Sequence, residues 1–127
     1  MITTKSNQAD YLTEFTDGAH TGQCDAPVGK GGQDAAFTPF ALLEASLAGC
    51  LNITLRAFAK SHDIDLGSAT VETSVTLVPG ENGSTFEYSV KLPDGLSEKD
   101  TKRLLAALKG CPIHGLLSKP VAFELKA

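Results

Sequence analysis

The stretch from Pro39 to Ser61 constrains the fold most, because large apolar residues recur along it at helical spacing. Thr38 supplies an N-cap, and Pro39 suits the first helical position. The middle of this stretch, residues 45–51, is almost wholly small or apolar, which predicts a helix buried on all sides. Gly49 inside the helix indicates a close approach by another backbone. We therefore expect a long central helix surrounded by other elements.

Alternation of apolar and polar residues predicts short strands on both sides of this helix. Before the helix, residues 11–16 form one candidate strand, and a second short strand ends at Cys24. After the helix, residues 69–78 and 86–92 flank a turn rich in Pro and Gly, which predicts a hairpin. We also expect residues 121–125 to close the chain as a strand.

Local signals also predict a loop and two shorter helices. Residues 26–36 contain one Pro and three Gly but few large apolar groups, which indicates a loop. Residues 97–100 have the form of a capping box and open an apolar-striped helix that Gly110 ends. Cys111 and Pro112 can then occupy the N-cap and the first position of one or two further turns.

Length and charge exclude several classes of protein. A chain of 127 residues with 42% hydrophobic residues predicts a single domain, 1–127, with one buried core. The net charge of -4 and the scattered basic residues argue against nucleic acid as a partner. No run of 18 apolar residues spans a bilayer and the first ten residues are polar, so we expect no membrane partner and a cytoplasmic location.

The chemistry of the chain is expected to centre on its thiols. Cys24, Cys50 and Cys111 are too few and too far apart for the disulfide framework of a secreted protein. Cys50 lies roughly 16 Å from the start of its helix, where the helix dipole gives no help, so another segment or subunit must activate it. Cys111 is placed as an N-cap, where free backbone N–H groups favour a thiolate. Judged on these positions alone, Cys111 is the more acidic thiol, and Cys24 is left as a packing or surface residue.

The neighbourhood of Cys111 also contains His114, which can assist the thiol or serve only in packing or at the surface. A metal site built from Cys50, Cys111, His114 and Cys24 needs ligands from three distant segments. We therefore expect no metal ion, and no cofactor is implied.

Two motifs stand out together: a cysteine deep inside a helix of small residues, and a later Cys-Pro-x-His. The stretches that contain them or accompany them are Gly31-Gly32, Thr38 to Cys50, Thr54 to Arg56, and Cys111 to His114. They resemble the OsmC/Ohr family of osmotically inducible and organic-hydroperoxide-resistance proteins. The resemblance implies an α+β fold with two small antiparallel sheets around a long central helix, in an intertwined homodimer with active sites at the interface.

The resemblance further implies the roles of the two thiols. Cys50 would be the peroxidatic thiol that attacks an organic hydroperoxide, and Cys111 would resolve the resulting sulfenic acid as a disulfide. A cellular dithiol would then reduce that disulfide. This assignment reverses the ranking of acidity above, and it makes the chain a thiol-dependent peroxidase with peroxiredoxin-type chemistry in oxidative-stress defence.

The chain departs from the dedicated hydroperoxide reductases of that family at two positions. Phe40 stands ten residues before Cys50, where those enzymes have Glu. Those enzymes also have an Arg in the N-terminal half, and neither Arg56 nor Arg103 fits its position. Glu44 is a possible supporting residue or a solvated helix charge, and Lys30 is a possible substitute cation. These departures favour the general OsmC-like redox-protein branch. They also favour an alternative function, a non-catalytic protein that binds a small hydrophobic ligand at the dimer interface.

Overall fold

The computed structural model describes residues 1–68 and 70–126. The chain divides into two compact units, residues 1–43 and 44–127, and the boundary falls inside the long helix. Ala69, the first residue of the predicted hairpin, lies outside the described residues, as does Ala127. The single domain 1–127 therefore stays a prediction, and each unit is described by itself.

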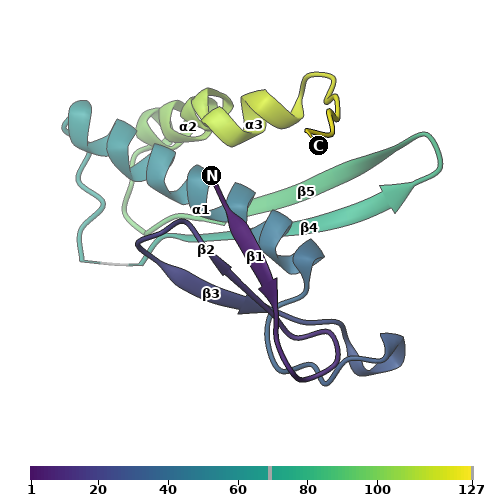
Figure 1. The fold of residues 1–127 in the computed structure, drawn as a ribbon. Coiled ribbons are helices and arrows are strands. Elements are labelled where there is room, and N and C mark those ends of the chain that lie inside the picture. The colour runs from purple at the N-terminus through teal and green to yellow at the C-terminus, as the bar shows by residue number, and fades with distance from the viewer. Residues whose placement is uncertain (69, 127) are drawn as a thin grey trace. The chain divides into compact units, whose positions relative to one another are not determined.

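The first unit contains a three-stranded antiparallel sheet in the order β1-β2-β3 (Figure 1). Its strands are β1, Thr3–Ser6, β2, Thr13–Thr16, and β3, Thr21–Cys24. The two predicted strands are confirmed as β2 and β3, whereas β1 is fully exposed and too polar to give an alternating signal. Phe15 pairs with Gly22 across β2 and β3, and its ring occupies the space that a larger side chain at Gly22 would need.

The loop predicted over residues 26–36 is ordered by the buried carboxylate of Asp25, and it includes a short 3-10 helix, η1, Val28–Lys30. Three backbone N–H groups donate to this carboxylate, from Ala26 at 2.8 Å, Gln33 at 3.2 Å and Ala35 at 3.1 Å. The bond from Ala35 lowers the pKa of Asp25 most, and together the three bonds outweigh burial and hold this pKa below its usual value. Gly32 packs against the backbone of Ala26, a space that any Cβ would fill.

The long helix α1 spans Pro39–Ser61, which confirms the predicted bounds. Its start is capped by Thr38, whose hydroxyl oxygen accepts the N–H of Ala41 at 3.1 Å. The buried residues of α1 form one stripe, Leu47, Leu51, Leu55 and Ala59. The prediction of burial on all sides is wrong for the single chain, because Ile53 is 61% exposed. Apart from its chain neighbours and the nearby backbone of α1 itself, no described residue comes within 4 Å of the position that a Cβ on Gly49 would take.

The predicted hairpin is confirmed in the second unit. Strand β4, Glu72–Gly80, pairs antiparallel with β5, Gly83–Lys91, and the register joins Gly80 to Gly83. The connection is therefore a turn of two residues, shorter than the predicted turn because Pro79 and Gly80 already belong to the ladder.

The helices after the hairpin follow their predicted signals. Helix α2 covers Glu98–Ala107, and the side chain of Ser97 caps it by accepting the N–H of Asp100 at 3.0 Å. The chain then tightens into the 3-10 helix η2, Leu108–Gly110, before α3, Pro112–Leu117. In the second unit, α2 and α3 lie along one side of α1 and the hairpin along the other (Figure 1).

The apolar core of the second unit gathers around the buried stripe of α1. The other buried members are Ile64, Val71, Leu104, Leu108 and Cys111. By length and composition alone, α1 is apolar enough to cross a membrane, a test that the core helix of a globular protein also passes. One stripe of α1 is buried in this cluster, while most of its apolar window is not buried within the structure.

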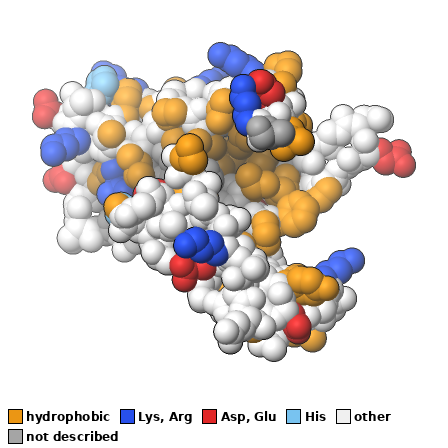
Figure 2. All heavy atoms as spheres, viewed as in Figure 1, with side chains coloured by type: hydrophobic (Ala, Val, Ile, Leu, Met, Phe, Trp, Pro, Cys, Tyr) orange, Lys and Arg blue, Asp and Glu red, His pale blue; other side chains and the backbone are white. Residues whose placement is uncertain are grey.

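The predicted C-terminal strand, residues 121–125, is wrong for the single chain. These residues form no strand, and among the described strands none pairs with them. A strand needs a paired neighbour to satisfy its backbone groups, so the alternating pattern is not sufficient by itself. Phe123 and Leu125 are left 94% and 92% exposed. Other apolar side chains gather beside this segment over the hairpin (Figure 2).

Candidate active site

The second unit brings together the two cysteines that the sequence singled out. Cys50 comes from the middle of α1, and Cys111 lies directly before α3. Both are free thiols, and the side chain of each shifts the pKa of the other, which places the two thiols next to each other. Two thiols in contact are arranged so that one can react and the other can form a disulfide with it.

The environment of Cys50 favours its thiolate. Burial raises the pKa of the Cys50 thiol and is the largest single effect. Hydrogen bonds from the Cys111 thiol, the backbone N–H of Ile113 and the side chain of Thr54 act in the opposite direction. Together they outweigh burial, so the pKa of Cys50 lies below its usual value.

The environment of Cys111 favours its neutral thiol. The residue is the N-cap of α3, as predicted, and its sulfur accepts the backbone N–H of His114 at 3.5 Å. Its exposed fraction is only 1%, however, and burial together with its hydrogen bond to Cys50 raises the pKa of Cys111. The N–H groups of His114 and Ile113 lower this pKa by less. The predicted ranking of the two thiols is therefore wrong: Cys50 is the more acidic.

The predicted order of the two thiol pKa values is wrong because a backbone N–H group at the N-terminus of α3 interacts with both sulfur atoms. The N–H of Ile113 stabilises a thiolate on Cys50 as well as on Cys111, and a sequence cannot show this long-range contact. Thr54 was also missed as a site residue. It lies four positions after Cys50 in α1, a spacing that places both side chains on one helix face, so the helix prediction already contained this signal.

The charged residues considered for the site are Glu44 and Lys30. The Glu44 carboxylate accepts the backbone N–H of Leu77 in β4 at 2.8 Å, which anchors α1 to the hairpin. The groups that lower the pKa of Cys50 within the described residues do not include Glu44, so its supporting role stays a prediction. Lys30 belongs to η1 in the first unit.

The His114 side chain points toward the hairpin. Its ring lies edge-on to Tyr88 with the ring centres 5.9 Å apart, and Nδ1 is 3.5 Å from the Ser118 hydroxyl. These residues line part of a cavity of about 250 Å³ together with Leu47 and Phe86. Of the two alternatives for His114, the ring contacts fit packing, while its backbone N–H contacts Cys111.

Cys24 is half-buried in β3 opposite Thr13, in the first unit. It therefore belongs to a different unit from the thiol pair. Within residues 1–68 and 70–126, no group of three or more His, Cys, Asp or Glu side chains is arranged to hold a metal ion.

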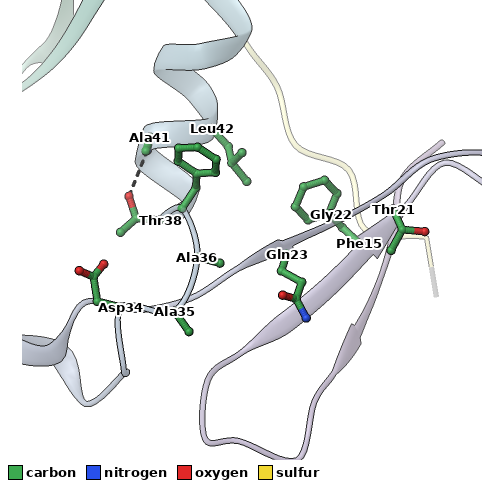
Figure 3. A pocket seen from close by; sticks show the side chains of 11 residues that line it. Phe15, Thr21, Gly22, Gln23, Asp34, Ala35, Ala36, Thr38, Ala41 and Leu42 are labelled. Carbon is green, nitrogen blue, oxygen red and sulfur yellow. Dashed lines mark hydrogen bonds between the residues drawn. The ribbon is translucent and has the colours of Figure 1, made fainter.

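The first unit contains an apolar cavity of about 830 Å³. It lies between β2, β3, the end of the loop and the first turn of α1, and Phe15 and Leu42 extend toward it (Figure 3). Its other apolar lining residues are Ala35, Ala36, Phe37 and Ala41. The volume and the lining suit a small apolar molecule.

Comparison with models of protein families identifies the family of the chain. The family model described as OsmC-like protein matches residues 31–126, so the chain belongs to the OsmC-like family. The matched segment includes both thiols and the whole of α1. No curated protein sequence matches the chain.

Solved structures agree with this assignment. A protein from Psychrobacter arcticus named for the osmotic stress and detoxification response is 25% identical, with a TM-score of 0.73 over 91% of this chain and 88% of its own. An OsmC-like protein from Mycoplasma pneumoniae is 22% identical, with a TM-score of 0.72 over 93% and 86%. An organic hydroperoxide resistance protein from Legionella pneumophila is 23% identical, with a TM-score of 0.65 over 91% and 86%. These likenesses confirm the predicted α+β fold with two small antiparallel sheets and a long helix.

Proposed function

We propose that this protein reduces organic hydroperoxides by a thiol-dependent reaction, with Cys50 as the attacking group. The observation that supports this most is the Cys50–Cys111 pair, in which the pKa of Cys50 is lowered and that of Cys111 is raised. The thiolate is the nucleophilic form of cysteine, and a neutral partner in contact can resolve the product. The name of the Legionella pneumophila relative is consistent with this substrate class.

The first step oxidises Cys50. Its thiolate attacks the outer oxygen of the hydroperoxide, a sulfur–oxygen bond forms and the oxygen–oxygen bond breaks. The sulfur loses two electrons, the peroxide gains them, and the organic part leaves as an alkoxide that takes up a proton to become an alcohol. Cys50 is left as a sulfenic acid.

The next steps restore the thiols. The sulfur of Cys111 attacks the sulfenic sulfur of Cys50, which releases water and forms the Cys50–Cys111 disulfide. A cellular dithiol then exchanges with this disulfide, returns both cysteines to thiols and leaves as its own disulfide. The cycle needs no cofactor or metal, and it fits a cytoplasmic enzyme of oxidative-stress defence.

The active form is a homodimer in this proposal. Ile53 on α1 is 61% exposed, and the space around Gly49 is open within the described part of the chain. The C-terminal segment exposes Phe123 and Leu125 in the alternating pattern of a strand that lacks a neighbour. A second copy would cover these apolar groups, so light scattering at micromolar concentration should give the mass of a dimer. A monomer would contradict this part of the proposal.

Steady-state assays test the proposed activity directly. Consumption of cumene hydroperoxide should depend on added dithiothreitol or a lipoyl-type dithiol. Peptide mapping after peroxide treatment without reductant should show a link between Cys50 and Cys111. A Cys24→Ser variant is the matched control, and it should keep both the activity and the link. A map in which only Cys24 is oxidised would contradict the proposal.

The first-unit cavity favours a second candidate function, the binding of a small apolar ligand without catalysis. Its lining is mostly apolar, and its volume of about 830 Å³ lies within the range of about 300–1,000 Å³ typical of ligand sites. Under this function, cumyl alcohol would bind as tightly as cumene hydroperoxide, and no peroxide would be consumed. Peroxide turnover supports the first function instead.

A further inference from the structure

Arg56 lies in the second half of α1 and has no part in the proposed thiol chemistry. Its Nε donates to Asn52 Oδ1 at 2.8 Å. The Asn52 amide nitrogen donates in turn to the carbonyl oxygen of Val71 at 3.0 Å. This chain of bonds links the exposed Arg56 side chain to the segment that leads into β4.

The two arginines of the chain differ in how their charges are used. Arg103 pairs with Asp100 at 3.2 Å and lies over the ring of Phe58, 5.9 Å from its centre. No ion pair among residues 1–68 and 70–126 includes Arg56. The two terminal nitrogens of the Arg56 guanidinium therefore have N–H groups available to bind a planar anion; these N–H groups are called the Arg56 fork below.

The guanidinium borders a cavity of about 420 Å³ with both polar and apolar walls. Leu66 and Val71 supply the apolar side, and none of the described lining residues is acidic. The Asp65 carboxylate, on the same loop, accepts the N–H of Gly67 at 2.7 Å. Because the chain has a net charge of -4, its overall charge would not attract an anion, so anion binding would depend on local contacts such as those of Arg56.

We infer that this cavity binds a small carboxylate with an apolar body. The Arg56 fork receives the carboxylate, Asn52 accepts a hydrogen bond from Nε of Arg56, and Leu66 and Val71 contact the hydrocarbon part. A planar carboxylate matches the planar guanidinium through two parallel hydrogen bonds. The inference is independent of the thiol pair and of peroxide reduction.

Amide chemical shifts measured by NMR during a hexanoate titration test the inference, with hexanamide as the neutral ligand of equal length. Hexanoate should shift the amide signals of Leu66, Gly67 and Val71 and bind at least about tenfold more tightly than hexanamide, because only the anion makes charge-assisted bonds. Inorganic phosphate should bind more weakly than hexanoate, because it lacks the apolar body. Equal binding of hexanoate and hexanamide would overturn the inference, and so would phosphate binding as tightly as hexanoate.

Variants of both arginines complete the test. Arg56→Gln should weaken hexanoate binding about tenfold or more, and Arg56→Lys should bind between wild type and Arg56→Gln because it keeps the charge but loses the fork. Arg103→Gln is the matched control and should bind as the wild type does. Unchanged binding in Arg56→Gln would overturn the inference, as would an equal loss in Arg103→Gln.

Discussion

Cys50 and Cys111 occupy opposite kinds of position on their helices, and their chemistry is opposite to what those positions suggest. Cys50 lies in the middle of α1, where the helix offers no free donors, yet its pKa is lowered. Cys111 caps the start of α3, where donors are free, yet its pKa is raised. The difference shows that donors from other segments and the extent of burial outweigh the position on the thiol's own helix.

Asp25 in the first unit follows the same rule as Cys50. Asp25 is buried and Cys50 is half-buried, and loss of contact with water by itself raises the pKa of a carboxyl or a thiol. In both, hydrogen bonds to the charged form outweigh burial and lower the pKa. Cys111 has fewer hydrogen bonds that stabilise its thiolate, so burial outweighs them and its pKa is raised.

The largest expected effect is on the free energy of unfolding, and it concerns the core that contains Cys111. Leu104 is fully buried in the same core, and Leu104→Ala should lower the free energy of unfolding by about 2–5 kcal/mol in urea titrations. Leu105→Ala on the same helix, where the side chain is 45% exposed, is the control and should change stability by less than about 0.5 kcal/mol. A loss of less than about 1 kcal/mol in Leu104→Ala would show that Leu104 is not tightly packed in the core that contains Cys111.

The next effect uses Asp25 to test hydrogen bonding against burial. Because the folded pKa of Asp25 is lowered, its charge stabilises the fold above the unfolded pKa, and this stabilisation is lost as pH falls through the folded pKa. Asp25→Asn should therefore lower the melting temperature clearly at pH 7 and much less at pH 2. The exposed Asp34→Asn is the control. Equal losses at both pH values would point to packing instead.

The smallest effect concerns a single hydrogen bond to Cys50. Thr54→Val removes one side-chain bond that lowers the pKa of Cys50, so alkylation of Cys50 by iodoacetamide at pH 7 should slow by about three- to tenfold. Thr76→Val, at an exposed position of β4, is the matched control. If both variants react at the wild-type rate, the Thr54 side chain does not help to stabilise the thiolate.

Features set by neighbouring residues could be predicted from the sequence. The bounds of α1 follow from the Thr38 cap, Pro39 and the apolar spacing, and the start of α2 follows from Ser97. The N-cap position of Cys111 was also predictable, because Pro112 follows it directly. Each of these signals lies within a few residues of the structure that it specifies.

Features set by distant contacts could not be predicted. The burial of α1 on one stripe, the unpaired residues 121–125 and the contact of Ile113 with Cys50 all depend on which elements pack together. The order of the two thiol pKa values depends on the same contacts. Resemblance to the family implied the order of reactivity that these pKa directions favour, whereas position on the helix implied the reverse.

The first turnover of two serine variants, both with Cys24→Ser, tests most directly whether Cys50 is the attacking thiol. The account predicts that Cys50→Ser consumes no hydroperoxide, because the attacking thiolate is gone. Cys111→Ser should consume about one peroxide per subunit and leave a sulfenic acid on Cys50 that dimedone traps. Consumption by Cys50→Ser together with a silent Cys111→Ser would contradict the account, because Cys111 would then be the attacking thiol.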